Sequence, residues 1–172
     1  VTLIRPIPPS FFSNSLNLLK DDPSIDGLIS AGSTGAVICG AILKLKRLEK
    51  AMPCLAAILP NNHQSNFCLV DCGANIDSPS EYLLSFAIQG ASYMSAYYGI
   101  ENPKVALLSN GSEDGKGDER TKKAFSLLKE SSLNFVGNVE GNRSLSGDCD
   151  VLVCDGFAGN QVLKNTEGMA TN

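Results

Sequence analysis

The sequence predicts an α/β protein built on a layered, largely parallel β-sheet. Short apolar runs typical of strands alternate with longer segments of helical periodicity along the chain. Four of these runs lead directly into glycine-rich turns, which span residues 30–35, 71–75, 110–117 and 155–160. Short connections between alternating strands and helices favour parallel strands with right-handed crossovers. The polar connection 60–66 instead predicts one antiparallel pair.

The composition is typical of one globular domain. Of 172 residues, 43% are hydrophobic and 19% charged, which is sufficient for a buried core. The net charge is −4 and the 14 lysines and arginines are scattered, so a nucleic-acid partner is disfavoured. No apolar stretch is long and continuous enough to span a bilayer. The chain starts without methionine and stops within a predicted helix, so we expect residues 1–172 to be a single domain of a longer protein.

The predicted elements follow from periodicity and from turn residues. Three prolines predict an extended segment over residues 1–10. We expect helices over 12–20, 34–47, 80–98 and 119–131, and strands over 27–30, 53–59, 67–70, 104–108, 134–137 and 150–154. The helix 80–98 has the clearest signals, because Pro79 precedes it, Gly99 can cap it, and one face carries Leu83, Leu84, Ala87, Ile88 and Ala91.

Six cysteines, at positions 39, 54, 68, 72, 149 and 154, lie in apolar runs or at strand ends. They lack the paired spacing of a zinc site, so we interpret them as buried thiols in a reducing cytoplasm. Cys72 and Cys154 adjoin glycine-rich turns, which leaves a reactive thiol as the alternative to packing.

The four glycine-rich turns predict a shared anion site. Ligands of open α/β sheets bind outside the carboxyl ends of the strands, where glycines let backbone N–H groups approach a phosphate. In the first turn the candidates are Gly32, Ser33, Thr34 and Gly35. Each turn alone also has a purely structural interpretation. None matches the nucleotide-binding phosphate loop or the dinucleotide motif, which disfavours both functions.

Lys116 is the main candidate for catalysis. It lies between two glycines in a turn rich in charged residues, including Glu113. Its ammonium can neutralise a phosphate and polarise a carbonyl whose oxygen gains charge during attack. The alternative is a solvated lysine among acidic neighbours.

Polar residues of the second and fourth turns are further candidates for substrate binding. Asn160 either caps the helix that follows it or presents its amide to a ligand. Asp71 and Asp155 either anchor their turns or orient substrate, and Asn75 lies in the second turn. The one histidine, His63, is far in sequence from all four turns, so a Ser-His-Asp triad is disfavoured.

Five motifs resemble the PlsX family, the acyl-ACP:phosphate acyltransferases of bacterial phospholipid synthesis. They are SAGSTGA (30–36), LVDCGANID (69–77), LLSNGSEDGKGDE (107–119), FVGNVEG (135–141) and VCDGFAGNQVLKNTEG (153–168). Together they cover about residues 25–169. The family's lysine falls on Lys116 and its asparagine on Asn160.

The resemblance implies a three-layer α/β/α fold akin to isocitrate and isopropylmalate dehydrogenases, a homodimer, and no metal or cofactor. It implies transfer of a long acyl chain from acyl carrier protein to inorganic phosphate, in the cytoplasm, with a peripheral membrane contact through segments outside these residues. Two departures from the family pattern are Ser33, where asparagine is usual, and Gly115, where a lysine is lost. An acidic carrier protein would need basic residues for docking, for which Lys44, Lys46, Arg47, Lys122 and Lys123 are candidates. Solvated helix faces explain these residues equally well.

Two alternatives remain open at the level of the sequence. The first is a phosphate acetyl- or butyryltransferase that uses coenzyme A as the acyl carrier, which thioester preference would distinguish. The second is a non-catalytic subunit that binds acyl carrier protein, although intact Lys116 and Asn160 argue against decay of the site.

Overall fold

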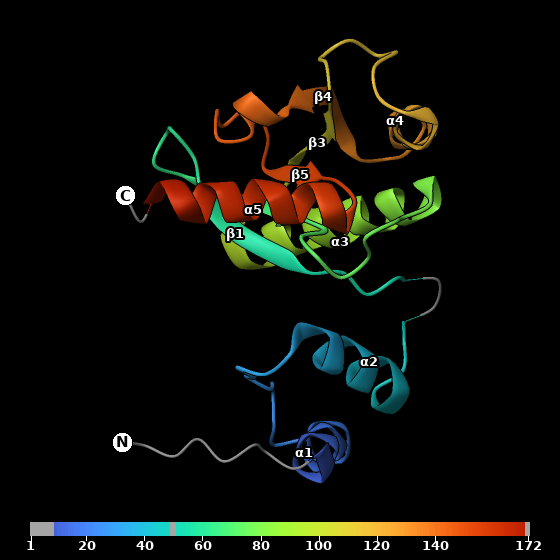
Figure 1. Cartoon of the computed structure of the whole chain (residues 1–172), viewed down its shortest axis with the longest axis vertical. Helices are drawn as coiled ribbons and strands as arrows, with labels where there is room; N and C mark the ends of the chain where they lie inside the picture. Colours follow the sequence, from blue (N-terminus) through green and yellow to red (C-terminus); the bar gives the residue numbers. More distant parts are fainter. Residues whose placement is uncertain (1–8, 49–50, 171–172) are drawn as a thin grey trace. The chain divides into compact units, whose positions relative to one another are not determined.

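A computed structural model describes residues 9–48 and 51–170, which belong to two compact units, residues 1–53 and 54–172 (Figure 1). Each unit is described by itself. Of the extended segment expected over residues 1–10, positions 1–8 lie outside the described residues, and Pro9 already begins a helix. That the 172 residues form one domain of a longer protein stays a prediction.

The first unit contains α1 (Pro9–Asp21) and α2 (Thr34–Lys44), which confirms both predicted helices. They pack closely at Gly40, where a Cβ atom would lie 2.7 Å from side-chain atoms of both Phe12 and Leu16. The helix α2 ends before Arg47 because the backbone turns left-handed at Lys46, with φ of 67°.

The predicted strand over residues 27–30 is wrong. Leu28 is partly exposed and Ile29 is 100% exposed. The described part of this unit contains no strand with which this segment could pair. A short apolar run cannot form a stable strand without a neighbour to satisfy its backbone groups.

The second unit is built on a five-stranded sheet in the order β1-β2-β5-β3-β4. Its strands are β1 (Ala56–Pro60), β2 (Asn66–Val70), β3 (Lys104–Ser109), β4 (Asn134–Glu140) and β5 (Val151–Val153). The pair β1–β2 is antiparallel and the other pairs are parallel. The prediction of a mostly parallel sheet with one antiparallel pair is therefore confirmed.

Helices cover both faces of this sheet (Figure 1). They are α3 (Ser80–Tyr98), α4 (Glu119–Lys129) and α5 (Gly156–Ala170), and a short 3-10 turn, η1 (Gly141–Arg143), follows β4. Leu69, Ala106 and Leu152 pack in the cluster that includes α5. Their neighbours along the strands point the other way, and Val70 and Val151 meet α3 at Gly90. This alternation places the sheet between two helical layers.

Two details of the prediction differ from the structure. The strand β1 has one buried residue, Leu59, because it lies at the edge of the sheet rather than within it. Ile88 was expected in the core but is exposed on α3. The predicted cap of α3 is confirmed, since Gly99 is left-handed with φ of 68°. No helix among the described residues has the length and apolar character needed to cross a membrane.

Gly90 tests how tightly α3 packs on the sheet. A Cβ atom there would lie 2.6 Å from Val151 Cγ1 and 3.2 Å from Val70 Cγ1. We expect Gly90→Leu to lower the free energy of unfolding by about 1–3 kcal/mol through overpacking. Ala96→Leu, on the exposed side of the same helix, is the matched control. Equal urea midpoints for the two variants would contradict this packing.

Candidate functional site

Three of the four glycine-rich turns meet at one edge of the sheet. They follow β2, β3 and β5, which are neighbouring parallel strands, so their carboxyl ends point the same way. The first turn belongs to the other unit. There Ser33 precedes α2, and Gly32, Ser33, Thr34 and Gly35 are all exposed. Whether this turn shares a ligand with the other three stays a prediction.

Asp71 is completely buried and organises the second turn. Its Oδ1 accepts hydrogen bonds from the backbone N–H groups of Leu55 at 2.9 Å, Gly73 at 3.3 Å and Ala74 at 3.1 Å. Its Oδ2 accepts from the backbone and the side-chain amide of Asn75, at 2.7 and 2.9 Å. These contacts favour the loop-anchoring interpretation of Asp71.

The start of α5 lies directly against this second turn. The Gly156 N–H donates to the carbonyl of Asn75 at 2.8 Å. At Gly156 a Cβ atom would lie 2.8 Å from that same carbonyl oxygen, and at Gly159 it would collide with the carbonyl oxygen of Asp71. Glycine is therefore required at both positions for this close approach.

Asp155 is the residue that caps α5. Its Oδ1 accepts a hydrogen bond from the Ala158 N–H at 2.8 Å, as expected of an N-cap aspartate. The expectation that Asn160 could cap this helix is wrong, because α5 begins four residues earlier at Gly156. Asn160 is half-buried, and its Oδ1 would lie 3.9 Å from a Cβ atom at Gly73. Its side chain thus faces the second turn, where a ligand could reach its amide.

Lys116 keeps an accessible ammonium. Its Nζ lies 4.0 Å from Glu113 Oε1, and the two side chains are 49% and 70% exposed. Such an exposed pair contributes little to stability. A Cβ atom at Gly111 would lie 2.6 Å from Lys116 Cγ, so this glycine makes room for the lysine stem. Asn138 of β4 stabilises the third turn, because its Nδ2 donates a hydrogen bond to the Glu113 carbonyl at 2.8 Å.

Arg120 was not predicted as a site residue, yet it joins the turns. Its guanidinium donates to Asp118 Oδ2 at 3.1 and 3.2 Å, contacts Asp77, and lies 3.7 Å from Asp155 Oδ2. Asp118 caps α4 by accepting from the Thr121 N–H at 2.8 Å. The hydrogen bonds that Asp118 accepts from the backbone and the hydroxyl of Thr121 lower the pKa of Asp118. The hydrogen bond from Arg120 to Asp118 raises the pKa of Arg120. The only feature of the sequence that pointed to Arg120 was the density of charged residues around Lys116.

A small cavity of about 70 Å³ lies where these elements meet. Its walls come from the end of β3, the start of α4, the start of α3 and the fourth turn. They are formed by Ser78, Leu83, Leu107, Leu108, Arg120, Thr121, Cys154, Asp155 and Ala158.

The cysteines follow the packing interpretation with one exception. All six are free; Cys39 is exposed and Cys54 is half-buried, whereas the other four are buried. The expectation that Cys39 is buried is therefore wrong, because α2 has no buried residue. Burial raises the pKa of Cys72 to about 11 and raises that of Cys154 well above its usual value. Neither has the character of a reactive thiolate. Among the described residues, no three His, Cys, Asp or Glu side chains cluster to hold a metal.

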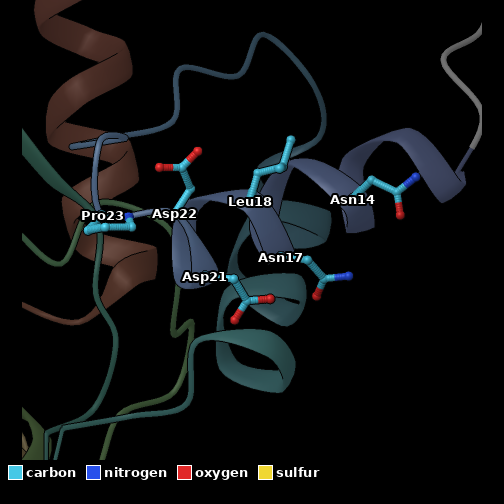
Figure 2. A pocket seen from close by; sticks show the side chains of 6 residues that line it. All are labelled: Asn14, Asn17, Leu18, Asp21, Asp22 and Pro23. Atoms are coloured by element: carbon cyan, nitrogen blue, oxygen red, sulfur yellow. The ribbon is translucent and has the colours of Figure 1, made fainter.

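Two further places carry no predicted site residue. His63 lies in the β1–β2 connection, at the opposite end of β2 from Asp71. A hollow in the first unit is lined by Asn14, Asn17, Leu18, Asp21, Asp22 and Pro23. Figure 2 shows that its side chains diverge, with Leu18 and Asp22 on one side of α1 and Asn17 and Asp21 on another. They do not converge on one point as ligands of a small molecule would.

The fold is that of the phosphotransacetylases. A phosphotransacetylase from Streptococcus pyogenes superposes with a TM-score of 0.71 at 18% identity, covering 92% of this chain and 55% of the other. The EutD phosphotransacetylase from Staphylococcus aureus gives 0.69 at 20% identity, with coverage of 93% and 56%. At this level of identity the likeness concerns the fold alone.

Sequence comparison then defines the family. Residues 9–172 match the profile of the family described as fatty acid synthesis protein. The phosphate acyltransferase of Clostridium acetobutylicum is 44% identical over 173 residues, covering 100% of this chain and 52% of the relative. That of Halothermothrix orenii is 48% identical over 159 residues, covering 91% and 47%. The chain belongs to this family, as its PlsX-like motifs implied, and it spans about half the length of these curated relatives.

A substitution at Gly159 tests how closely α5 packs against the second turn. Because a Cβ atom there meets the Asp71 carbonyl and lies 2.8 Å from Cys154 Sγ, we expect Gly159→Ala to destabilise the protein by about 1–3 kcal/mol. Gly168→Ala in the same helix is the control, since a Cβ atom there meets nothing within 4 Å. It should be neutral or stabilising by up to about 1 kcal/mol. Urea unfolding measures both, and a neutral Gly159→Ala would refute the close approach.

Thiol labelling tests the burial of the cysteines. At pH 8 we expect iodoacetamide to modify Cys39 first and to leave Cys68, Cys72 and Cys149 unmodified until urea is added. Burial raises the pKa of Cys68 and Cys149 to about 12, and only the thiolate is nucleophilic. Labelling of Cys72 should therefore increase as the pH approaches 11. Mass spectrometry locates the label, and reaction of Cys72 as fast as Cys39 would contradict this assignment.

Proposed function

We propose that the protein to which these residues belong transfers an acyl group from a thioester to inorganic phosphate, giving acyl phosphate. The observation that carries the proposal is the accessible Lys116 ammonium at the end of β3, next to the strand that leads into α5 and Asn160. The names of the curated relatives, phosphate acyltransferase, support the same reaction. We further propose that the donor is a long-chain acyl group on acyl carrier protein, as the PlsX resemblance implies.

The chemistry needs positioning more than activation. A phosphate oxygen forms a bond to the thioester carbonyl carbon, and the carbonyl oxygen gains negative charge. The carbon–sulfur bond then breaks with its electron pair going to sulfur, and the proton lost by hydrogen phosphate converts the carrier thiolate to the free thiol. Inorganic phosphate is already a nucleophile, so holding it against the carbonyl and stabilising the oxyanion account for catalysis. Lys116 binds the phosphate and the developing charge, and Asn160 donates a hydrogen bond to the oxyanion or to the phosphate.

The remaining predicted residues take supporting roles in this proposal. Asp71, Asn75 and Asp155 shape the second and fourth turns, and Glu113 orients the Lys116 ammonium. The backbone N–H groups of residues 32–35 add donors for the phosphate if the first turn joins the site, because the first N–H groups of a helix have no partner within it.

Partners and location are proposals of the same kind. We propose that the protein is a homodimer, with a peripheral membrane contact outside these residues. We also propose that it works in the cytoplasm, which the six cysteines without disulfide bonds support. For docking of the carrier protein, Lys44, Lys46 and Arg47 are the stronger candidates. Lys122 and Lys123 are less suitable, because they already pair with Glu119 and Glu81.

A second candidate is transfer from an acyl-coenzyme A. It is supported by the fold, which this chain shares with proteins named phosphotransacetylases. Thioester preference separates the two candidates.

Lys116→Ala tests the proposal. In the full-length protein we expect phosphate-dependent release of the carrier thiol from palmitoyl-ACP, and at least a ~100-fold loss of kcat in the variant, as for loss of an oxyanion donor. Lys164→Ala, an exposed lysine paired with Glu167 of its own helix, should leave the rate unchanged. Full activity in Lys116→Ala would remove this lysine from catalysis. Release from acyl-coenzyme A alone would favour the second candidate, and no release from either thioester would favour a binding subunit.

A further inference from the structure

We propose that Arg120 is a positioning residue that sets the distance between Lys116 and Asn160 by joining the third turn to the fourth. The inference rests on the proposed function, because it assigns these two side chains to one reaction. The guanidinium bonds to Asp118 at 3.1 and 3.2 Å through two of its nitrogens and approaches Asp155 Oδ2 to 3.7 Å.

Both carboxylates lie close along the chain to the proposed catalytic residues. Asp118 follows Lys116 by two residues and caps α4 through Thr121. Asp155 caps α5, in which Asn160 lies in the first turns. A shift of either capping residue therefore moves a catalytic side chain. Arg120 spans the two caps because its planar guanidinium offers several donors in a fixed arrangement.

Apolar packing does not replace this link. The cavity of about 70 Å³ lies between the end of β3 and the fourth turn, and Arg120 and Asp155 both line it. The turns are thus not packed directly against each other at this point. Arg120 also contacts Asp77, which lies in the loop between the second turn and α3.

The charges argue against a role for Arg120 as a ligand of phosphate. Its one positive charge faces three carboxylates, those of Asp77, Asp118 and Asp155. A phosphate dianion placed here would meet net negative charge, and like charges at close range repel. The accessible ammonium of Lys116 is the better ligand, and Arg120 acts through the two caps.

The proposal predicts different effects of removing Arg120 on the turnover rate and on the free energy of unfolding. The Arg120 and Asp118 side chains are 42% and 53% exposed, and exposed ion pairs contribute little to unfolding. A displacement of about 1 Å in a catalytic group, by contrast, costs on the order of 100-fold in rate. Removing Arg120 should therefore slow turnover far more than it shifts unfolding.

The test compares Arg120→Met, Arg120→Lys and the control Arg143→Met in the full-length protein. Arg143 is an exposed arginine paired with Asp148 at 2.7 Å. We expect Arg120→Met to lower kcat by about 10- to 100-fold with a much smaller change in the KM for phosphate, and to share the urea midpoint of the control. Arg120→Lys should recover part of kcat, because an ammonium can hold one carboxylate but not both.

A double-variant cycle and hydrogen exchange complete the test. If Arg120 acts through Asp155, the effects of Arg120→Met and Asp155→Asn on kcat will not add. The amides of Thr121 and Ala158, which donate to the two caps, should exchange faster in Arg120→Met. Exchange needs no turnover, so it tests the link even if phosphate-dependent activity is absent from the wild-type protein, which would refute the proposed function instead.

Three outcomes would overturn the inference. A raised KM for phosphate with unchanged kcat would make Arg120 an anion ligand. A urea midpoint lowered in proportion to kcat would make it a structural residue. Unchanged exchange at Thr121 and Ala158 would mean that Arg120 does not link the turns.

Discussion

The buried carboxylate of Asp71 is the interaction on which the sheet edge depends. A charge taken out of water is costly unless hydrogen bonds replace its hydration, and Asp71 receives five N–H donors from Leu55, Gly73, Ala74 and Asn75. These bonds determine the path of the second turn. The start of α5 then rests on the carbonyls of that turn, so the carboxylate also determines where the fourth turn begins.

The accessible side chains of the proposed site lie on backbone segments that less exposed polar side chains hold in place. Lys116 and Asn160 are not enclosed, yet each lies on a turn held by less exposed neighbours. Asn138 binds the carbonyl in the third turn, and Asp155 caps the helix that carries Asn160. A site of this kind keeps reactive groups free for a ligand while their backbone is fixed, which is what preorganised catalysis requires.

Local patterns predicted most of the fold because they report local physics. The helix Ser80–Tyr98 and its left-handed Gly99 cap follow from periodicity and from the freedom of glycine at positive φ. The failures that concern burial share one cause. Residues 27–30 and Ile88 have the composition of core segments, but burial depends on whether another element covers them, and none of the described elements of their own unit does. Periodicity contains no information about whether another element packs over a segment.

The sequence by itself determined the class of the fold, the glycine-rich turns at the strand ends, and the ammonium and amide side chains available there. The tertiary structure decided the partners. Asp71 bonds to Leu55, 16 residues away, and Arg120 reaches Asp77, 43 residues away. The Asp71–Leu55 bond continues the register of the β1–β2 pair, in which Ala56 lies opposite Val70. Arg120 reaches Asp77 because β5 lies between β2 and β3, which brings the ends of all three strands to one edge of the sheet. Strand order results from how the whole core packs, so no local pattern could have revealed that Arg120 contacts both Asp77 and Asp155.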